Sequence, residues 1–415
     1  MQAETLAQPQ AETQAQTRAE GGQDPLPGQS PGRVRVYIDA WDPSYGSGLE
    51  TSDAGPTGES SAPVKLDVET PPESWQPLSP PPQLRAPDSV LFVDGVRRID
   101  TNLWVEEADG TLLPGIAASY AAGVVRCDLR GGRADVVSAQ VERGLFTPSA
   151  HAVGLSCGNT RYEVRRVAAE EPAQLSQAVQ PCLQRLEVDV SNRARAGSPS
   201  EDDLLVLDGR LRDRSTLPRA LGYIKTHHQQ YLPADLAAVV RRLRPGQRTP
   251  VFLLGTRWQN YTWYLKLPGP AGSPWAGVVR LEASADLTRP DVIQLADVST
   301  ITLPRFASTS YKDSRAPQNL TPIAGLERRL RGMLGDQRLL LRSLTAAAAA
   351  QHHAAAAAAQ HHTEAAASQH HMTAAAAQQH TAAAAAQHHT ASAAQREAAS
   401  HAEEGHRESR RRDAA

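Results

Sequence analysis

The stretch Val90-Leu91-Phe92-Val93-Asp94-Gly95-Val96-Arg97-Arg98-Ile99-Asp100 is an apolar run that ends on an Asp-Gly pair and then turns into a basic second run. Branched and aromatic apolar residues in such a run are typical of a buried strand. A carboxylate at the end of a buried strand lies at the rim of a sheet, where metal-dependent phosphoryl-transfer enzymes place a ligand. Asp-Gly between two strand-like runs is also a common hairpin turn, so Asp94 alone leaves both interpretations open.

The same pattern recurs at Leu204-Leu205-Val206-Leu207-Asp208-Gly209, a second apolar run that ends on Asp-Gly. A third carboxylate, Glu187, lies in a segment whose apolar residues recur every three or four positions. This spacing predicts an amphipathic helix over residues 168–192. Glu187 falls beside its apolar stripe, where a carboxylate is costly unless it is paired or bound to a cation. The alternative for Glu187 is a salt bridge with Arg185 or Arg193.

The three carboxylates Asp94, Glu187 and Asp208 are therefore candidate catalytic residues and candidate metal ligands. Clustered oxygen ligands suit hard divalent cations, which activate a water and stabilise the leaving oxygen of a phosphodiester. Lys225, Tyr264 and Arg280 lie in further strand-like runs and are candidates for holding phosphates. Each also has a simpler interpretation, because lysines are commonly solvated and aromatic residues are common on edge strands.

The remaining pattern predicts strands and helices in alternation. Strands are expected at 34–41, 64–69, 102–106, 116–129, 222–226, 251–255, 261–267 and 277–282, and helices at 233–243 and 326–344. Asp109-Gly110 is expected to form a hairpin turn. Strands first, then strands mixed with helices, indicate an α/β protein with a mixed sheet flanked by helices. The predicted domains are a disordered lead (1–32), short strands with a proline-rich connector (33–87), a main domain (88–345) and a low-complexity tail (346–415).

Composition narrows the function classes. The 415 residues carry a net charge of −2, so no global basic field points to nucleic acid, although the arginine-rich segments 210–257 and 328–342 permit a polyanion groove. Three cysteines without CxxC spacing disfavour a disulfide framework or a zinc site. The sequence shows neither a secretory signal nor a run approaching the ~18 apolar residues of a membrane helix. We expect a soluble, cytoplasmic protein.

The ordered series of these motifs resembles the NurA family of DNA-end-processing nucleases over about residues 90–344. The matching segments are 92–95, 186–187, 205–209, 222–226, 263–267, 279–282 and 315–320. The resemblance implies an RNase H-like fold and a manganese-dependent (or magnesium-dependent) deoxyribonuclease that acts in double-strand break repair. It also implies a homodimer that works with a hexameric HerA-type ATPase. Asp94, Glu187 and Asp208 would be metal ligands, and Tyr264 the active-site tyrosine.

One departure from the family concerns a catalytic histidine that usually follows the late Pro-x-x-Leu element. Here Pro317-Gln318-Asn319-Leu320 is followed by Thr321-Pro322-Ile323-Ala324-Gly325, without a histidine. Asn319 and Lys312 are nearby candidates for its place. A second hypothesis is therefore a catalytically weak NurA-like platform that binds DNA or the ATPase. A third is an unrelated mixed α/β protein with two Asp-Gly hairpins.

The C-terminal tail has a repeat of its own. Gln351, Gln360, Gln369, Gln378 and Gln387 recur every nine residues, mostly followed by His-His, with alanine runs between them. Alanine favours helix. Nine residues make about two and a half helical turns, so neighbouring histidine pairs face opposite ways, and aligned pairs are ~27 Å apart. The spacing favours a solubilising or weakly metal-binding tail over a dedicated metal site.

Overall fold

The computed structural model describes residues 62–412, apart from residues 108, 170, 199–201, 212–213, 215, 228, 256–258, 270–271 and 273. These residues belong to one compact unit, Asp39–Ala415. The predicted lead (1–32) and the predicted strand at 34–41 lie outside the described residues, and the predicted domain boundaries stay a prediction. Among the helices of the described part, none is long and apolar enough to cross a membrane.

The described strands form one mixed, eleven-stranded sheet in the order β1-β9-β10-β11-β8-β7-β2-β3-β4-β6-β5. Their bounds are β1 Val64–Lys65, β2 Ser89–Glu106, β3 Leu112–Asp128, β4 Arg133–Thr147, β5 Leu155–Cys157, β6 Thr160–Arg166, β7 Asp203–Asp208, β8 Ala220–Ile224, β9 Phe252–Gly255, β10 Gln259–Lys266 and β11 Val278–Ser284.

The centre of the sheet has the connectivity of an RNase H-like fold. Strands β2, β3 and β4 pair antiparallel in sequence order. The helix α1 (Pro172–Ala196) then crosses over to β7, which pairs parallel with β2, and β8 pairs parallel with β7. A parallel neighbour requires such a crossover, whereas antiparallel neighbours need only a turn. The predicted fold class, an RNase H-like mixed α/β sheet flanked by helices, is confirmed.

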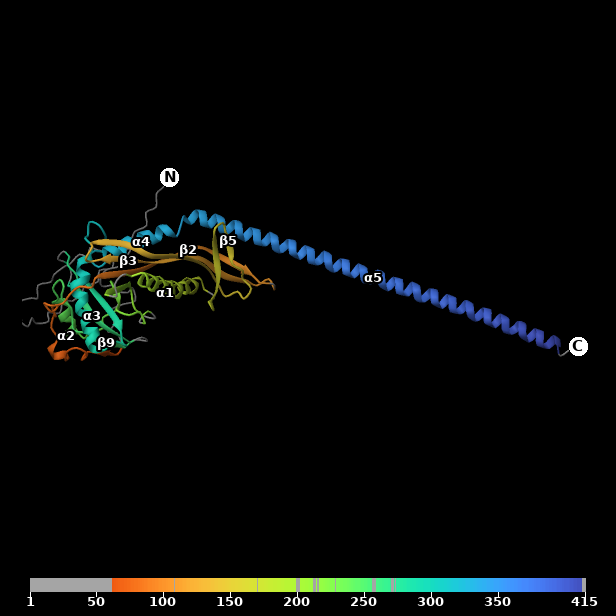
Figure 1. Ribbon diagram of the computed structural model, residues 1–415, viewed down its shortest axis with the longest axis horizontal. Helices are drawn as coiled ribbons and strands as arrows, with labels where there is room; N and C mark the ends of the chain where they lie inside the picture. Colours follow the sequence, from red (N-terminus) through yellow and green to blue (C-terminus); the bar gives the residue numbers. More distant parts are fainter. Residues whose placement is uncertain are drawn as a thin grey trace, which may run out of the picture. The chain divides into compact units, whose positions relative to one another are not determined.

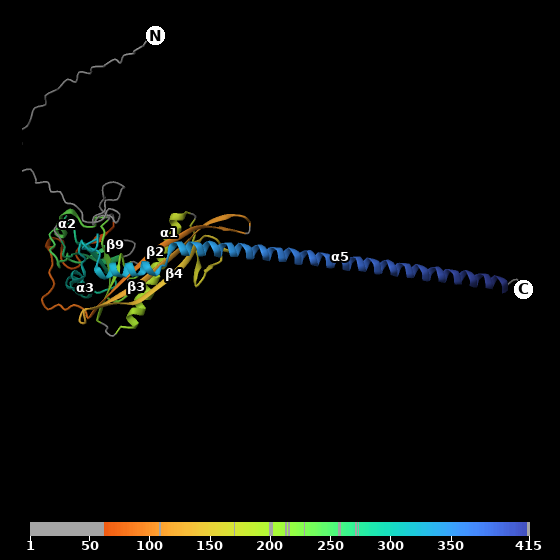
Figure 2. The same ribbon diagram turned by 90° about the horizontal axis from the view of Figure 1, so that it is seen from above.

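Helices cover both faces of this sheet (Figures 1 and 2). Because side chains alternate along a strand, Leu91 and Val93 of β2 pack with α1, whereas Phe92 and Val96 pack into the cluster that contains α3 and α4. The α1 face also carries α2. The bounds are α2 Ala234–Arg241, α3 Arg289–Thr302 and α4 Thr321–Met333. We refer below to the α1 face and the α4 face.

The segment that precedes β2 is joined to the sheet. Val64 and Lys65 pair with β9 at its edge, which is shorter than the strand predicted at 64–69. Glu69 accepts two hydrogen bonds from the buried guanidinium of Arg248, at 2.7 and 2.8 Å. Trp75 is buried beside Phe252, with ring centroids 5.9 Å apart.

Strand β2 corrects the prediction that a strand ends at Asp94-Gly95. It continues through 18 residues, with one irregularity between Ile99 and Thr101, because its pairing with β3 extends to Glu106. The predicted strand that ends at Asp94, the basic run after it and the predicted strand at 102–106 thus form one strand. The Asp-Gly pair that does make a hairpin is Asp109-Gly110, as predicted, with Gly110 at φ +83°.

The helix predicted at 326–344 is also corrected, since two helices share this segment. Helix α4 ends at Met333 and α5 runs over Gln337–Arg412. Gly335, at φ +81°, adopts the left-handed conformation that ends helices. The carbonyls exposed there accept hydrogen bonds from Arg98 and Arg143, at 2.8 and 3.0 Å. Apolar periodicity continued across the break and concealed it.

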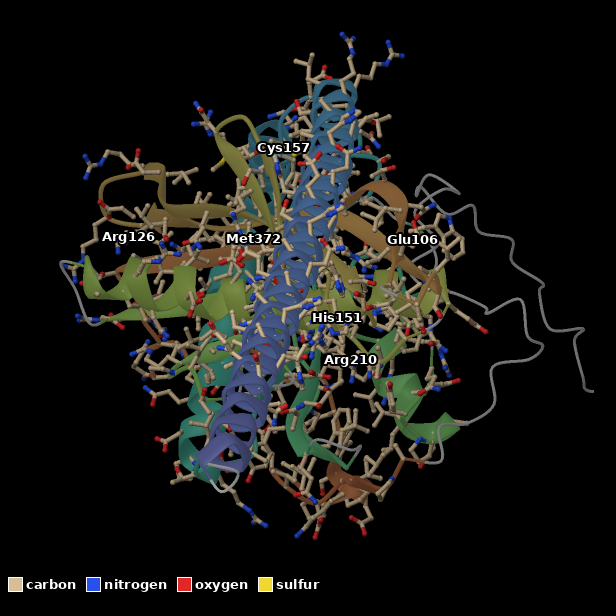
Figure 3. All side chains as sticks on the ribbon, turned by 90° about the vertical axis from the view of Figure 1, so that its right-hand side faces the viewer. Glu106, Arg126, His151, Cys157, Arg210 and Met372 are labelled. Carbon is tan, nitrogen blue, oxygen red and sulfur yellow. The ribbon has the colours of Figure 1, made fainter. Side chains whose placement is uncertain are left out.

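Helix α5 includes the alanine-rich tail, which is helical as predicted. Its start packs on the sheet, where Leu344 is buried in a cluster with Leu145 and Tyr162. Gln351 donates a hydrogen bond to the carbonyl of Gly154 at 3.2 Å. Beyond this point the described side chains of α5 are exposed or, at Ser392, partly exposed; Met372 is 74% exposed (Figure 3). The tail thus adds helix without adding core.

Candidate active site

Asp94 and Asp208 are neighbours because of the register between two parallel strands. The last partners of β2 and β7 are Val93 and Leu207, so each aspartate directly follows the last pair. Asp94 and Asp208 come two positions after Phe92 and Val206, which pack on the α4 face, so both aspartates lie on that face. The structure therefore brings together two of the predicted carboxylates, on one face of the sheet.

Asp94 is buried, with 8% of its surface exposed. Its Oδ1 accepts a hydrogen bond from its neighbour's backbone, Gly95 N–H, at 2.8 Å. Burial raises the pKa of the Asp94 carboxyl well above its usual range, and the charge of Asp208 raises it further, whereas Lys225 acts in the opposite direction. Burial and the neighbouring carboxylate thus both disfavour the charged form of Asp94.

Lys225 directly follows β8 and reaches the same point. Its Nζ lies 2.6 Å from Asp208 Oδ2 and 3.0 Å from Asn319 Oδ1. Asn319 is fully buried, and its amide nitrogen donates to Asp313 Oδ2 at 2.5 Å. Asn319, one of the two candidates for the place of the missing histidine, therefore lies at the site. The other, Lys312, is exposed and lies over the Tyr311 ring.

Glu187 approaches from the α1 face. It is 5% exposed and forms a buried ion pair with Arg214. The predicted alternative, a salt bridge, is therefore present, but its partner is Arg214 rather than Arg185 or Arg193. Burial raises the pKa of the Glu187 carboxyl, and the Arg214 charge opposes this effect. Glu187 Oε1 lies close to the backbone of Gly95: a Cβ atom added to Gly95 would be only 2.7 Å from it.

The predicted ligands approach this part of the sheet from both faces. Asp94 and Asp208 lie on the α4 face, whereas Glu187 comes from the α1 face, lies against Gly95 and lines the same cavity as Asp208. Within the described residues, no three His, Cys, Asp or Glu side chains are grouped so that they could hold a metal ion. In donor chemistry the Asp94–Asp208 pair fits a hard divalent cation, since Mg²⁺ is commonly bound through one or two carboxylates.

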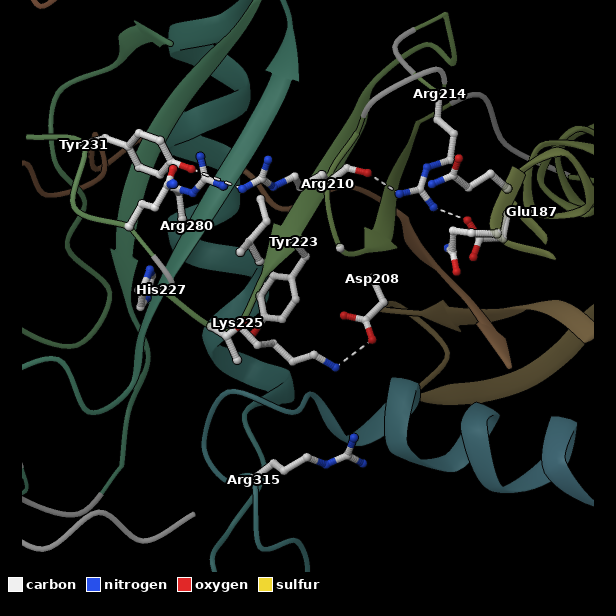
Figure 4. Close-up of a pocket in the computed structure, with 16 residues that line it drawn as sticks. Glu187, Asp208, Arg210, Arg214, Tyr223, Lys225, His227, Tyr231, Arg280 and Arg315 are labelled. Atoms are coloured by element: carbon white, nitrogen blue, oxygen red, sulfur yellow. Dashed lines mark hydrogen bonds and ion pairs between the residues drawn. The ribbon is translucent and has the colours of Figure 1, made fainter. Parts of the chain in front are cut away.

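A cavity of about 800 Å³ opens beyond the carboxyl ends of β7 and β8. Ligands of open α/β sheets bind at this kind of position. Two carboxylates and five cationic side chains line it: Glu187, Asp208, Arg210, Arg214, Lys225, Arg280 and Arg315 (Figure 4). Four of these cations have a carboxylate partner: Lys225 pairs with Asp208, Arg214 with Glu187, Arg280 with Glu282 and Arg315 with Glu327. The lining is thus rich in guanidinium and ammonium donors, which suit an anionic ligand.

Arg280 forms part of this wall from β11. Arg280 is 2% exposed, and its guanidinium carbon lies 4.8 Å from the centroid of the Tyr231 ring. Glu282 Oε1 is 3.1 Å from its Nη1, yet Nη1 makes no hydrogen bond of acceptable geometry in the described part of the chain. Arg210 donates to the Tyr231 hydroxyl at 3.1 Å, so the tyrosine lies between two guanidiniums. The wall thus offers a buried donor to an anion.

The Tyr264 side chain lies apart from the cavity lining. It is buried with Phe252, Trp275 and His227, with ring centroids 5.7 to 6.1 Å away. Burial raises the pKa of its hydroxyl to about 12, so it stays a phenol at neutral pH. The structure therefore brings Lys225 and Arg280 to the cavity, but places the Tyr264 ring in a hydrophobic cluster.

Sequence reasoning missed Arg214, Arg210 and Tyr231. Arg214 is separated from Glu187 by 27 positions and follows no periodic pattern. The one indication was indirect: a carboxylate beside an apolar stripe needs a cation. Nothing in the spacing identified which arginine would provide it.

No family model matches the sequence, and no curated protein matches it. Two solved structures show similarity to part of the chain. Endonuclease V from Bacillus subtilis is 11% identical, with 59% of this chain and 80% of that chain covered and a TM-score of 0.27. A cysteine-substituted catalytic domain of human endonuclease V is 16% identical, with 60% and 85% covered and a TM-score of 0.24. At these TM-scores neither similarity bears on the function of this chain.

Proposed function

We propose that this chain hydrolyses phosphodiester bonds of DNA with a divalent metal ion, Mn²⁺ or Mg²⁺, held by Asp94 and Asp208. One observation carries this proposal: two carboxylates adjacent through strand register lie beside a cavity lined mainly by cations. The carboxylates suit a metal and the cations suit the phosphates. The NurA resemblance extends the proposal to DNA ends, break repair, a homodimer and a HerA-type ATPase partner.

Each group of the site has a distinct task in this proposal. Asp94 and Asp208 would hold the metal ion, which would supply activation of a water and positive charge to offset that of the phosphate. Burial and repulsion from Asp208 raise the pKa of Asp94, and a cation bound there would offset both effects. Lys225 and Arg280, which both line the cavity, hold phosphate oxygens.

Glu187 could become a third metal ligand only after a change in its present contacts. Its carboxylate is already neutralised by Arg214, and it approaches from the other face of the sheet. As a third ligand it would have to leave Arg214 and move past Gly95. In the arrangement described, Glu187 with Arg214 instead fixes the wall of the cavity.

A second candidate function is a catalytically weak platform that binds DNA or a HerA-type ATPase. Two observations favour it. Lys225 and Arg214 neutralise two of the three carboxylates within the protein. In addition, the sequence lacks the late histidine of the NurA family, and Asn319 near that position contacts Lys225.

Degradation of end-labelled duplex and single-stranded DNA, with Mn²⁺, Mg²⁺ or EDTA, distinguishes these functions. Asp94→Asn removes the charge and preserves the shape of the side chain, and Asp235→Asn, at an exposed position in α2, is the matched control. A nuclease loses metal-dependent cleavage in Asp94→Asn and keeps it in Asp235→Asn. DNA retention without cleavage in all three proteins would favour the platform.

A further inference from the structure

The Lys225 ammonium lies between two oxygen acceptors of different character. Asp208 Oδ2, at 2.6 Å, is charged, and Asn319 Oδ1, at 3.0 Å, is neutral. The side chains of Lys225 and Asp208 are 15% and 18% exposed, so water solvates this pair only in part. The Lys225 ammonium therefore lies beside the carboxylate that a metal ion at the aspartate pair would also have to contact.

The neutral acceptor is held in place independently of the carboxylate pair. Asn319 donates its amide N–H to Asp313 Oδ2, which turns its Oδ1 toward Lys225. Its backbone N–H donates to the carbonyl of Arg315 at 2.9 Å. The adjacent Gln318 carbonyl accepts a hydrogen bond from the buried Tyr223 hydroxyl at 2.6 Å, which fastens this loop to β8. Asn319 is therefore a fixed acceptor.

We propose that Lys225 is a displaceable internal cation and that Asn319 is its positioning residue. In the metal-free protein Lys225 neutralises Asp208. When a divalent ion binds the aspartates, Lys225 leaves Asp208, stays hydrogen-bonded to Asn319, and is then free to contact a phosphate oxygen. This inference rests on the proposed metal site, but concerns how that site exchanges one cation for another.

The exchange follows from charge. A lysine ammonium and a divalent ion close to one carboxylate repel each other, and in a partly buried site this repulsion is poorly screened. A metal therefore binds only at the cost of breaking the Lys225–Asp208 pair. The Asn319 acceptor lowers that cost, because the displaced ammonium keeps one of its protein hydrogen bonds.

Direct Mn²⁺ binding, measured by calorimetry without DNA, tests the exchange. Lys225→Met removes the competing charge and preserves the aliphatic stem, so we expect Mn²⁺ to bind roughly tenfold more tightly, while DNA cleavage decreases. Lys225→Arg keeps the charge and serves as the control, without tighter binding. If Lys225→Met fails to fold, as judged by circular dichroism and thermal unfolding, Lys225→Gln replaces it.

Asn319 is tested by a double-mutant cycle. Asn319→Leu leaves a displaced Lys225 without its second acceptor, so Mn²⁺ should bind several-fold more weakly. In the Lys225→Met background the same substitution should leave Mn²⁺ affinity unchanged, because no ammonium needs the acceptor. A purely structural role of Asn319 would weaken binding equally in both backgrounds, and that outcome overturns the assignment.

The two proposals fail in different ways. If the wild-type protein binds no Mn²⁺, or if Asp94→Asn and Asp208→Asn bind it unchanged, the metal site itself is wrong and the exchange falls with it. If wild-type protein binds Mn²⁺ through the aspartates but Lys225→Met binds it equally or more weakly, the metal site stands. Only the displaceable cation is then overturned.

Discussion

Glu187 Oε1 lies against the backbone of Gly95, so closely that a Cβ atom on Gly95 would lie 2.7 Å from it. The same Cβ would also lie 2.7 Å from Leu183 Cδ1. Helix α1 and strand β2 therefore make this close approach only because residue 95 has no side chain. The glycine that suggested a hairpin turn in the sequence instead admits a carboxylate beside Asp94.

Gly95→Ala is predicted to destabilise the protein by about 1–3 kcal/mol, as expected for overpacking a well-packed contact. The added methyl group must push Glu187 and Leu183 away from β2. The matched control is Gly325→Ala in α4, where a Cβ would contact nothing and alanine favours the helix. Urea unfolding measures both, and an unchanged midpoint for Gly95→Ala would contradict the packing described.

Asp94→Asn is predicted to raise stability at neutral pH in the absence of metal. Because the folded-state pKa of Asp94 is raised above its ordinary value of 3.8, its contribution to stability is fully present below that value and is lost as pH rises through the folded pKa. Asparagine does not ionise and avoids this loss. The thermal midpoint of Asp94→Asn should therefore exceed that of wild type by an amount that grows from pH 4 upward.

A lower midpoint for Asp94→Asn than for wild type, at pH 7 in EDTA, would contradict the predicted cost of the buried Asp94 charge. A further comparison includes Mn²⁺, which should raise the wild-type midpoint and leave that of Asp94→Asn nearly unchanged, because only the carboxylate attracts the ion.

Arg214→Met is predicted to cost about 3–5 kcal/mol, since it leaves the Glu187 carboxylate buried without a partner. The loss should be larger at pH 8 than at pH 5, where Glu187 can take up a proton. The double variant Glu187→Leu with Arg214→Met should recover most of the stability. The control is Arg331→Met. The Arg331 side chain is 62% exposed, and its ion pair with Glu327, four residues earlier, is worth about 0.3–0.5 kcal/mol.

The residues that sequence reasoning placed correctly are those governed by local pattern. A continuous apolar run identified β7 and the carboxylate at its end, and three–four periodicity identified α1 and the inner position of Glu187. Asp94 was placed at the end of a strand that in fact continues. Its position at the site depends on where pairing with β7 stops, which is a property of two strands rather than one.

The residues that sequence reasoning could not place depend on contacts between distant segments. Lys225 and Asn319 are 94 positions apart, and Arg214 reaches Glu187 from a loop without periodicity. The face of the sheet from which each carboxylate approaches also depends on packing. A strand predicts alternation, but not which face meets α1 and which meets α4, so the approach of Glu187 from the face opposite the aspartates was not predictable.

Glu69→Ala tests whether the segment before β2 is part of the core. Arg248 is 1% exposed and is held by Glu69 and Asp297, so removing Glu69 leaves a buried guanidinium with one carboxylate. We expect a loss of about 3–5 kcal/mol in urea unfolding. Glu73→Ala, at an exposed position of the same segment, should change stability by less than about 0.5 kcal/mol. Equal effects of the two substitutions would place Glu69 outside the core.

Two truncations separate the packed start of α5 from its exposed remainder. Ending the chain after Gln351 removes only residues whose described side chains are exposed or partly exposed, so the unfolding midpoint and DNA cleavage should not change, while helix content decreases. Ending it after Asp336 also removes Leu344, which is 3% exposed against Leu145 and Tyr162. Loss of this buried leucine should cost about 2–3 kcal/mol. If the truncation after Gln351 already lowers the midpoint, the alanine-rich part of α5 stabilises the protein through contacts beyond those of Leu344 and Gln351.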